Sequence, residues 1–583
     1  MTRIAVPGPA GAEPGKRGGS RLREPVAPEA SDACRYLCTG VHTDDRFRSE
    51  VIEELSVHQE RFTAPSFGID AARVLAHAHH ARRRELAWSL GILALWVVAI
   101  PLTGGQFLVL MIPSLILALI ARLDSTGRKT PAAGRAVLSL LRWSARLLLA
   151  YLLVLLLVRG IGGFFEDDDA DSSGESAGDS GTASLGDLFS FFDAGARPHG
   201  YALLAVFLYA GLVFLVGMRR AQVAQLLTGP LSAARFPQAA DDPAERSASP
   251  GRRLRLAVIR EEQHAPLVMY HMESPFRGAG EAFQPWTLTV ELRPRKGREP
   301  DTLDNRTVIE RVRPLVEALT VPAPHDSPDA ADAVRDRLRE LRTDEVVFLP
   351  ADGIAGRRSA PYDPEAIEAH HRAAVEEGGE ARRHFLRIRV GGWHEDIVVT
   401  VFVRVHTQGG MLMLEFAPHV LQPVRSAFRD AERDAHRYTA GGVLGKIAWA
   451  VARTPASLTS SVGTVYRTTV ESWDGYTGGY AEALPEGPAI AVRELGAEGG
   501  GSLFQQMDVV RYLRSIQDRV TEGVKYSLRD AGWQTEEFEQ KIINVSGGVY
   551  IDSANNSAFG FGENSTAKVA NFNKGAEHGD KDD

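Results

Sequence analysis

The first residues whose types and spacing could support chemistry are Cys34, Cys38 and His42. In a helix, residues four and eight positions apart share a face, so these three side chains would converge. Two thiolates and an imidazole can bind zinc, and two adjacent thiols can form a redox pair. A structural zinc site normally has four ligands, and no fourth candidate accompanies these three. We therefore favour small, buried cysteines on a helix.

A second cluster, His77, His79 and His80, directly precedes three arginines at 82–84. His77 and His80 could share a helix face, but two histidines without a carboxylate are weak evidence for a metal. Basic residues beside a membrane attract anionic headgroups, and each contributes about 1 kcal/mol. We therefore interpret this segment as a helix that lies next to the membrane and contacts anionic lipid.

The C-terminal half contains three further polar motifs. They are the pair His370 and His371, the turn WHED at 393–396 and the glycine loop FRGAG at 276–280. A histidine beside two acids could act as a general base, and glycine loops can bind phosphate. However, the glycine loop lacks the Lys-Ser/Thr pair of a P-loop, and no nucleophile, HExxH or dinucleotide motif is present. We therefore expect an exposed polar turn, and we predict no catalytic, cofactor-binding or metal-binding residue and no cofactor. These motifs favour a non-enzymatic protein and leave a membrane-tethered enzyme as an alternative.

The elements that must position all of these residues are four apolar segments, at 86–103, 106–121, 137–160 and 201–218. A helix needs about 20 apolar residues to cross a hydrocarbon core about 30 Å thick, so the first two segments are slightly short. Gly104 and Gly105 join them, which indicates a tight turn. The third segment contains a run without charge at 147–158. We predict an α-helical membrane domain of four spans rather than buried helices of a soluble domain.

The charges that flank these segments are asymmetric. Arginines occur at 82–84, at 219–220 and through 122–146, whereas 161–199 is rich in Asp and Glu. Loops rich in Lys and Arg stay in the cytoplasm. We therefore predict a multi-pass plasma-membrane protein with both termini in the cytoplasm and the acidic loop 161–199 outside.

Composition narrows the functional classes further. The chain has 583 residues, a net charge of −8 and only two cysteines. A negative net charge gives no global basic field for nucleic acid, and two cysteines on the cytoplasmic side form no disulfide framework. Residues 1–30 lack the apolar run of a signal peptide, so we expect the first span to direct insertion.

The remaining chain divides by composition and periodicity. We predict a disordered tail at 1–30, a cytoplasmic helical segment at 31–85, the membrane domain at 86–220, a linker at 221–252, a cytoplasmic α+β domain at 253–437, a small-residue-rich connection at 438–502, helices at 503–543 and a Gly-rich, β-like tail with a disordered end at 544–583. A helix at 70–86 is expected to run directly into the first span.

Alternating and periodic patterns indicate a mainly antiparallel sheet in the α+β domain. We predict strands at 254–258, 266–272, 286–292, 345–349, 384–390, 396–406 and 411–416, and helices at 308–319 and 329–341. The last three strands would form a meander. The basic loop at 293–298, together with Arg252, Arg253 and Arg255, is expected to face the membrane surface.

The C-terminal helix is the clearest soluble helix. Its apolar stripe is Met507, Val510, Leu513, Ile516, Val520 and Val524. Such a stripe more often packs within one chain than between subunits. In the connection before it, Pro455 is expected to end any helix, and the short apolar stretch there is not counted as a fifth span.

Two short motifs resemble uncharacterised multi-pass membrane proteins of high-GC actinobacteria. They are RYLC at 35–38 with the turn APSFG at 64–68, and SPFRGAG at 274–280. The Gly-rich tail also resembles short repeats attached to bacterial signalling and defence proteins. The resemblance implies a membrane location and carries no known activity.

Three functional hypotheses follow. The first is a non-catalytic anchor, scaffold or sensor that presents the α+β domain, binds a bilayer with anionic headgroups and forms a homo-oligomer through its C-terminal helix and tail. The second is a channel or transporter, but the spans lack a deeply placed ionisable residue. The third is a membrane-tethered enzyme acting on a lipid or nucleotide, for which no motif is present. We favour the first.

Overall fold

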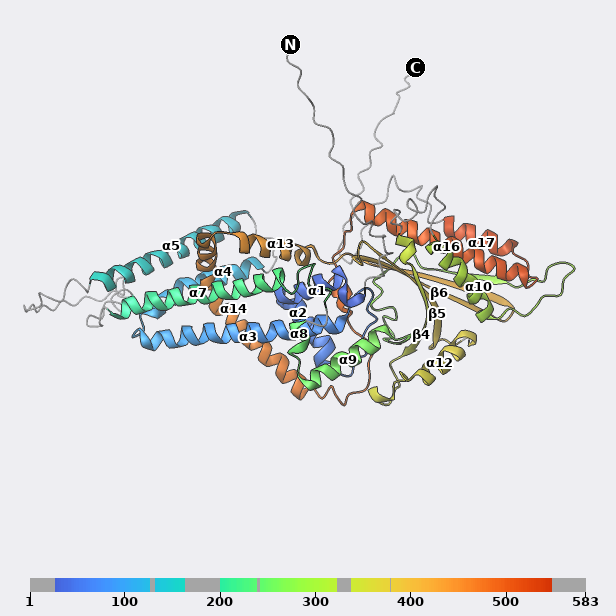
Figure 1. Cartoon of the computed structure of the whole chain (residues 1–583), viewed down its shortest axis with the longest axis horizontal. Helices are drawn as coiled ribbons and strands as arrows, with labels where there is room; N and C mark the ends of the chain where they lie inside the picture. Colours follow the sequence, from blue (N-terminus) through green and yellow to red (C-terminus); the bar gives the residue numbers. More distant parts are fainter. Residues whose placement is uncertain are drawn as a thin grey trace, which may run out of the picture.

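The computed structural model describes residues 27–125, 132–162, 200–238, 242–321, 337–377 and 379–547. Apolar helices form one end of the molecule, and a sheet covered by helices forms the other (Figure 1). Several predicted segments lie wholly or mostly outside the described residues. They are 1–26 of the tail predicted at 1–30, 163–199 of the acidic loop predicted at 161–199, most of the helix predicted at 329–341, and the tail from 548.

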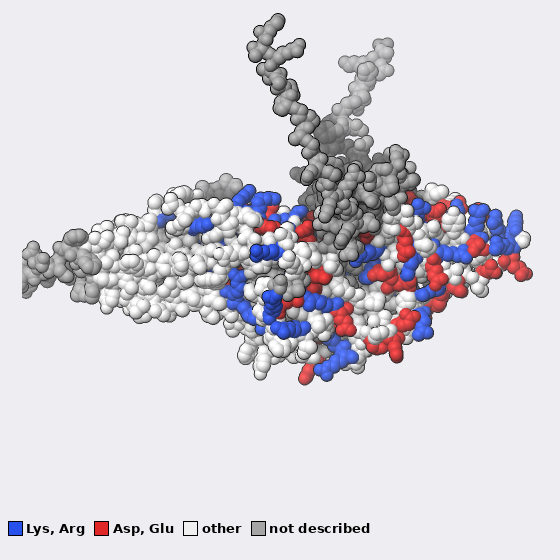
Figure 2. Space-filling model, viewed as in Figure 1, with Lys and Arg blue, Asp and Glu red and all other residues white. Residues whose placement is uncertain are grey.

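Three helices are long and apolar enough to cross a membrane. They are α3 (Ala71–Leu102), α5 (Ala132–Gly162), of which Val137–Ile161 is the apolar part, and α7 (Gly200–Thr228). Helix α4 (Phe107–Ser125) has a shorter apolar part, Phe107–Leu117, so the fourth span stays a prediction. Figure 2 shows this end almost free of charged side chains, with Lys and Arg gathered where it meets the rest of the molecule.

The connection between α3 and α4 is the predicted tight turn. Gly104 and Gly105 have φ values of 58° and 90°, a backbone region that side chains disfavour. Thr103 closes the turn, because its hydroxyl donates to the Ala99 carbonyl at 2.7 Å and accepts from the Phe107 N–H at 3.1 Å.

A helical middle section surrounds the first half of α3, which runs into the bundle without a break, as expected. It contains η1 (Pro28–Ala30), α1 (Asp32–Thr43), α2 (Asp45–Ile52), η2 (Glu53–Val57), α8 (Pro243–Arg246), α9 (Pro250–His264) and α13 (Ser426–Ala440). Together with α3 and the end of α7, these elements bury one apolar core. Ser31 and Asp44 cap α1 and α2 by accepting hydrogen bonds from backbone N–H groups.

The strand predicted at 254–258 is wrong, because this segment belongs to helix α9. Leu256 and Ile259, three positions apart, are buried against the middle section, whereas Leu254 is 71% exposed. Three alternating residues suggested a period of two, but the buried positions follow the helical period.

The C-terminal half contains a seven-stranded, mostly antiparallel sheet in the order β1-β4-β5-β6-β7-β2, with β3 also paired to β7. The strands are β1 (Leu267–Tyr270), β2 (Glu281–Ala282), β3 (Trp286–Glu291), β4 (Arg342–Pro350), β5 (Arg383–Gly392), β6 (Ile397–Gln408) and β7 (Met411–Leu421). The predicted meander is confirmed as β5-β6-β7. Only β1 and β4 pair in parallel, so the sheet is mixed.

Helices cover this sheet. They are α10 (Asn305–Glu317), α12 (Pro364–Glu376), α16 (Leu503–Asp530) and α17 (Glu536–Gly547), with short elements η4 (Ala318–Thr320), η5 (Arg337–Glu340), η6 (Arg357–Ser359) and α15 (Val492–Leu495). The α16 stripe packs on the sheet through Leu513, Ile516, Val520 and Val524, as predicted. Its N-terminal part differs from the prediction, since Val509 is buried and Met507 is 59% exposed.

Pro455 does not end a helix, contrary to our expectation. Helix α14 (Val443–Thr477) is continuous through it and lies against α3, α4 and α7 at the base of the bundle (Figure 1). Thr454, Pro455 and Ser461 are buried in these contacts. Small side chains allow close helix packing, and neighbouring helices can offset the backbone hydrogen bond that proline removes.

Two helical glycines allow a direct test of the packing. A Cβ atom at Gly523 on α16 would lie 2.9 Å from the Val312 Cα of α10, whereas one at Gly463 on α14 would meet nothing within 4 Å. We expect Gly523→Ala to destabilise the protein by about 1–3 kcal/mol, the usual cost of overpacking. Gly463→Ala should be neutral or stabilising by up to about 1 kcal/mol. Thermal unfolding of the detergent-solubilised protein measures both, and an equal effect would contradict this packing of α10 on α16.

Candidate functional site

A buried polar cluster lies in the first half of α3. Asp242, which follows α7 in the chain, accepts hydrogen bonds at its Oδ2 from Arg73 Nε at 2.8 Å and from His77 Nε2 at 2.9 Å. His77 Nδ1 lies 3.2 Å from Nε2 of His42 on α1. The side chains of Arg73, His77 and Asp242 are each at most 3% exposed. The cluster therefore joins α1, α3 and the segment after α7.

The charge states of this cluster follow from its surroundings. Burial alone would raise the pKa of Asp242, but His77, the Ala244 N–H and Arg73 hold it well below its ordinary value. Burial lowers the pKa of His42 well below its usual range, and the neighbouring His77 and His80 lower it further. The cluster thus contains a carboxylate paired with an arginine, and His42 is neutral at pH 7.

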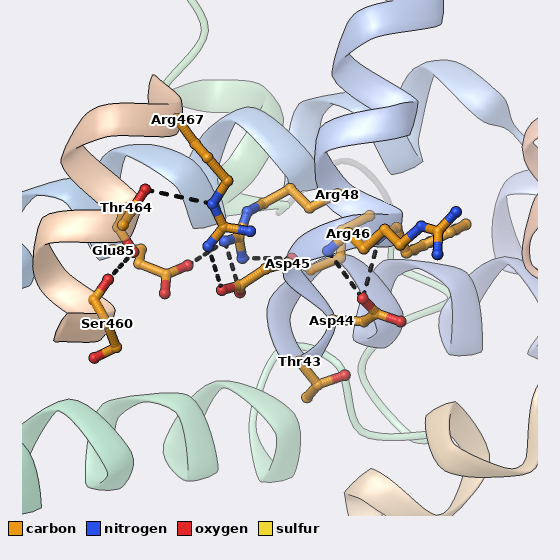
Figure 3. A network of polar contacts seen from close by, with 12 residues as sticks. Thr43, Asp44, Asp45, Arg46, Arg48, Glu85, Ser460, Thr464 and Arg467 are labelled. Atoms are coloured by element: carbon orange, nitrogen blue, oxygen red, sulfur yellow. Dashed lines mark hydrogen bonds and ion pairs between the residues drawn. The ribbon is translucent and has the colours of Figure 1, made fainter. Parts of the chain in front are cut away.

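A second polar network lies just below the spans (Figure 3). The Glu85 carboxylate on α3 pairs with Arg48 of α2 and with Arg219 of α7, and its side chain is 11% exposed. Asp45 accepts from Arg48 at 2.9 Å and from Arg467 of α14 at 3.0 Å. Burial would raise the pKa of Asp45, but these arginines lower it. The network links four helices at the base of the bundle.

These networks are suited to positioning helices. Each of the carboxylates Asp45, Glu85 and Asp242 pairs with one or two arginines, most of them from another element. Breaking a buried pair costs several kcal/mol because one charge is left without compensation. Their chemistry is therefore that of ion pairs that fix α1, α2, α3, α7 and α14 together.

A third cluster in the sheet domain brings together two histidines and a carboxylate. Glu345 Oε2 on β4 lies 2.7 Å from His371 Nε2 of α12 and 2.9 Å from His384 Nε2 of β5. The three groups lie within 4.8 Å of one another and could hold a metal ion. His371 belongs to the histidine pair singled out in the sequence, whereas His370 contacts Arg382 at 3.0 Å.

The surroundings of this cluster disfavour a cation. Arg313 pairs with Glu345 Oε1, and Arg306 Nη1 lies 3.4 Å from Oε2. Burial alone would raise the pKa of Glu345, but His371, His384 and Arg313 hold it well below its ordinary value. Two arginines already neutralise the only carboxylate, so a divalent ion would meet repulsion here. We interpret the cluster as a hydrogen-bonded ion group that ties α10 and α12 to the sheet.

The turn at 393–396 combines backbone strain with buried anchors. Trp393, His394 and Glu395 have φ values of 54°, 60° and 66°, which non-glycine residues rarely adopt. Asp396 holds the turn by accepting from the Val424 N–H at 3.0 Å, and its own carbonyl accepts from buried Arg493 at 2.6 Å. Trp393 and His394 are exposed, as expected for a polar turn, but Asp396 is buried.

The glycine loop at 276–280 does bind an anion, but the anion belongs to the chain. The N–H groups of Gly278 and Gly280 donate to Glu494 Oε1 at 2.7 and 2.9 Å. These are the donors that a phosphate would need, so Glu494 occupies the place of a ligand. Cys34 and Cys38 are fully buried on α1 without a disulfide, in agreement with the interpretation of small core residues.

Sequence reasoning missed the partners that complete these clusters. Asp242 lies in the predicted linker, 165 residues from His77, and nothing local connects them. Glu85 adjoins the first span, and its position beside three arginines was the available signal. The basic loop at 293–298 contacts the end of α16, where Arg298 donates to the Asp530 carbonyl at 2.9 Å. Its predicted approach to the membrane surface stays a prediction.

The fold therefore joins apolar helices of membrane length to a mixed-sheet domain. Residues 285–559 match the family model of the AbeC-like domain, which fits the expectation of an uncharacterised family. This segment starts just before β3 and includes α14, but it leaves out α3, α4, α5 and α7. It covers just under half of the chain, and the motifs that resemble actinobacterial membrane proteins lie outside it. No curated protein and no solved structure matches the chain.

Removing the charge of Asp242 tests the first cluster. Asp242→Asn leaves the Arg73 guanidinium buried without a counter-charge, so we expect a loss of about 3–5 kcal/mol in the free energy of unfolding. Asp430→Asn is the control, because its ion pair with Arg433 is half exposed and contributes at most about 1 kcal/mol. Chemical unfolding of the solubilised protein measures both, and equal losses would show that the cluster is dispensable.

The low pKa of His42 predicts how stability depends on pH. Below about pH 6.5 the unfolded chain binds a proton at this histidine that the folded protein does not, so stability falls as the pH decreases. His42→Gln removes this difference, and its stability should decline by about 1 kcal/mol less between pH 7.5 and 5.5. Buried His384 and His419 contribute equally in both proteins.

Thermal unfolding at the two pH values checks this prediction. His394→Gln, at an exposed position in the 393–396 turn, is the control for the same substitution outside the buried cluster. A decline in His42→Gln as large as in the unmodified protein would contradict the assignment.

Proposed function

We propose that this protein is a non-catalytic plasma-membrane anchor that presents a cytoplasmic α+β domain in a fixed orientation and acts as a scaffold or sensor. The observation that carries the proposal is that α3 belongs both to the helical middle section and to the bundle of apolar helices. Its first half is buried in the middle section with α1 and α9, and its second half is an apolar membrane helix. A continuous helix resists bending between the two parts, unlike a flexible linker.

Helix α14 supports the same proposal from the other side of the chain. It follows the last strand of the sheet and α13, and then lies across α3, α4 and α7. Arg82 of α3 donates to the Thr468 carbonyl at 2.9 Å and pairs with Glu471 at 3.2 Å. Because the AbeC-like segment includes α14, the segment itself supplies a contact with the apolar helices.

The orientation rests on the distribution of charge. Arginines at 82–84 and 219–220 lie at the end of the bundle that adjoins the sheet domain, where Figure 2 shows basic side chains gathered. Basic residues beside a span stay in the cytoplasm, so we assign the sheet domain and both termini to that side. The acidic segment at 163–199 connects α5 to α7 and is assigned to the outside.

The described clusters favour an anchor over an enzyme. Glu345 is held by two arginines and two histidines, Glu494 fills the glycine loop, and both cysteines are buried. Partner binding is supported at the start of α16, where Leu503, Phe504 and Met507 are 59–70% exposed. A homo-oligomer through this helix and the tail remains part of the proposal.

Cysteine labelling tests the anchor and its orientation. Both native cysteines are buried, so replacing Cys34 and Cys38 with alanine gives a background for single cysteines. We expect Ser184→Cys, in the acidic segment, to react with a membrane-impermeant maleimide in intact cells. Leu484→Cys, 75% exposed on the opposite side, should react only after permeabilisation. The reverse pattern would contradict the orientation, and labelling of Leu484→Cys in a soluble fraction would contradict the anchor.

A further inference from the structure

A cavity of about 310 Å³ is lined by residues of α3, α8 and α9, just before the first apolar segment. Figure 1 shows these three helices side by side. Three arginines line it, namely Arg83, Arg252 and Arg255. His79 also lines it, but burial lowers its pKa to about 4, so it is neutral at pH 7. Leu75, Ala76 and Leu256 contribute apolar wall. No carboxylate is among the described residues that line it, although Glu54, Glu60 and Glu262 lie near Arg255 and offset part of its charge.

The hydrogen-bond acceptors of Arg83 and Arg255 are neutral oxygen atoms. Arg83 donates to the carbonyl and hydroxyl of Ser247 at 3.0–3.3 Å, and Arg255 Nε donates to the Leu55 carbonyl at 2.8 Å. The Arg252 side chain makes no hydrogen bond or ion pair with another residue in the described part of the chain. Burial, followed by the charge of Arg357, lowers the pKa of Arg255 to about 10, so Arg255 still carries its proton at pH 7.

The backbone of α9 adds to the positive potential. The helix begins at Pro250, and Gly251 and Arg252 of its first turn line the cavity. No side chain caps this end, so the positive end of the helix dipole contributes to the same space. The donors and the cavity together suit a group with negative charge and several acceptor oxygens.

One end of the cavity, at Arg83, lies at the depth of a lipid headgroup. Arg83 precedes Leu86, where the apolar segment begins, by three residues, or about 4–5 Å along the helix. The polar region of each leaflet is about 5–7 Å thick, which places Arg83 among the phosphates. Leu90 and Val97 follow Arg83 at seven-residue spacing, so the three share a helix face, and Leu90 and Val97 are 51% and 64% exposed.

We propose that this cavity is a specific site for the phosphate headgroup of an anionic phospholipid. The phosphate lies between Arg83, Arg252 and Arg255, and an acyl chain follows the exposed face of α3 past Leu90 and Val97. A soluble phosphate offers the same headgroup chemistry, but Arg83 shares a helix face with the exposed apolar side chains of Leu90 and Val97, and this continuity favours a lipid. Binding here would fix α9 to α3 when the protein enters an anionic bilayer.

Native mass spectrometry of the full-length protein tests the site. The protein is solubilised from vesicles of equal phosphatidylglycerol and phosphatidylcholine, and the retained lipid is identified. We expect preferential retention of one phosphatidylglycerol, and about fivefold or greater loss of retention in Arg252→Gln. Arg253→Gln is the matched control, because Arg253 is exposed on the same helix, makes the same change in charge and does not line the cavity.

The other outcomes of the lipid-retention experiment would each overturn part of the proposal. Equal loss in Arg252→Gln and Arg253→Gln would show general surface attraction and overturn the site. Displacement of the lipid by inorganic phosphate, but not by chloride at the same ionic strength, would show a site for soluble phosphate and overturn the lipid assignment. Because Arg252 makes no hydrogen bond or ion pair with another described residue, Arg252→Gln should keep the unfolding temperature of the unmodified protein. A large decrease would itself overturn the assignment of Arg252 as an unpaired ligand.

Discussion

The carboxylate of Asp242 is the constraint on which the middle of the molecule depends. It lies among Arg73 and His77 of α3 with a side chain only 2% exposed, so its charge must be compensated inside the protein. Arg73 both neutralises this charge and fixes the position of the segment, because it also donates to the Phe236 carbonyl at 3.0 Å. The segment after α7 is therefore held against α3, and α8 and α9 can follow it to the same side.

Further ion pairs along α3 connect the apolar helices to the sheet domain. Glu85 repeats the arrangement about three turns further along α3, closer to the bilayer, where it binds arginines from α2 and α7. Helix α14 then adds the sheet domain to the same base through Arg467 and Glu471. Charged side chains are thus concentrated where apolar helices end, the one level at which both water and protein can solvate them.

The sequence predicted those elements whose signals are local. The apolar segments, the Gly104-Gly105 turn and the meander of β5, β6 and β7 follow from composition, turn chemistry and alternation over a few residues. Helix α9 was missed because Leu254, Leu256 and Val258 alternate by chance, and burial at Leu256 and Ile259 is decided by contact with distant α3. Pro455 was misjudged because the neighbouring helices that support α14 are set by tertiary structure.

The candidate clusters show the same division. The positions of His77 and His371 were noticed, but their carboxylate partners, Asp242 and Glu345, lie 165 and 26 residues away and could not be paired without the fold. The glycine loop does bind an anion, but that anion is the carboxylate of Glu494, which lies 216 residues further along the chain. Residue types therefore indicate a chemistry, whereas only the fold shows whether the protein has already satisfied it.

The central claim is that the sheet domain is held rigidly to the membrane helices. Spin labels on Phe207→Cys of α7 and Arg372→Cys of α12, both exposed, in the protein lacking Cys34 and Cys38 would report the distance between the two parts in nanodiscs. Double electron–electron resonance should give one narrow distance distribution. A broad distribution would show a domain on a flexible tether and would contradict the role assigned to α3 and α14.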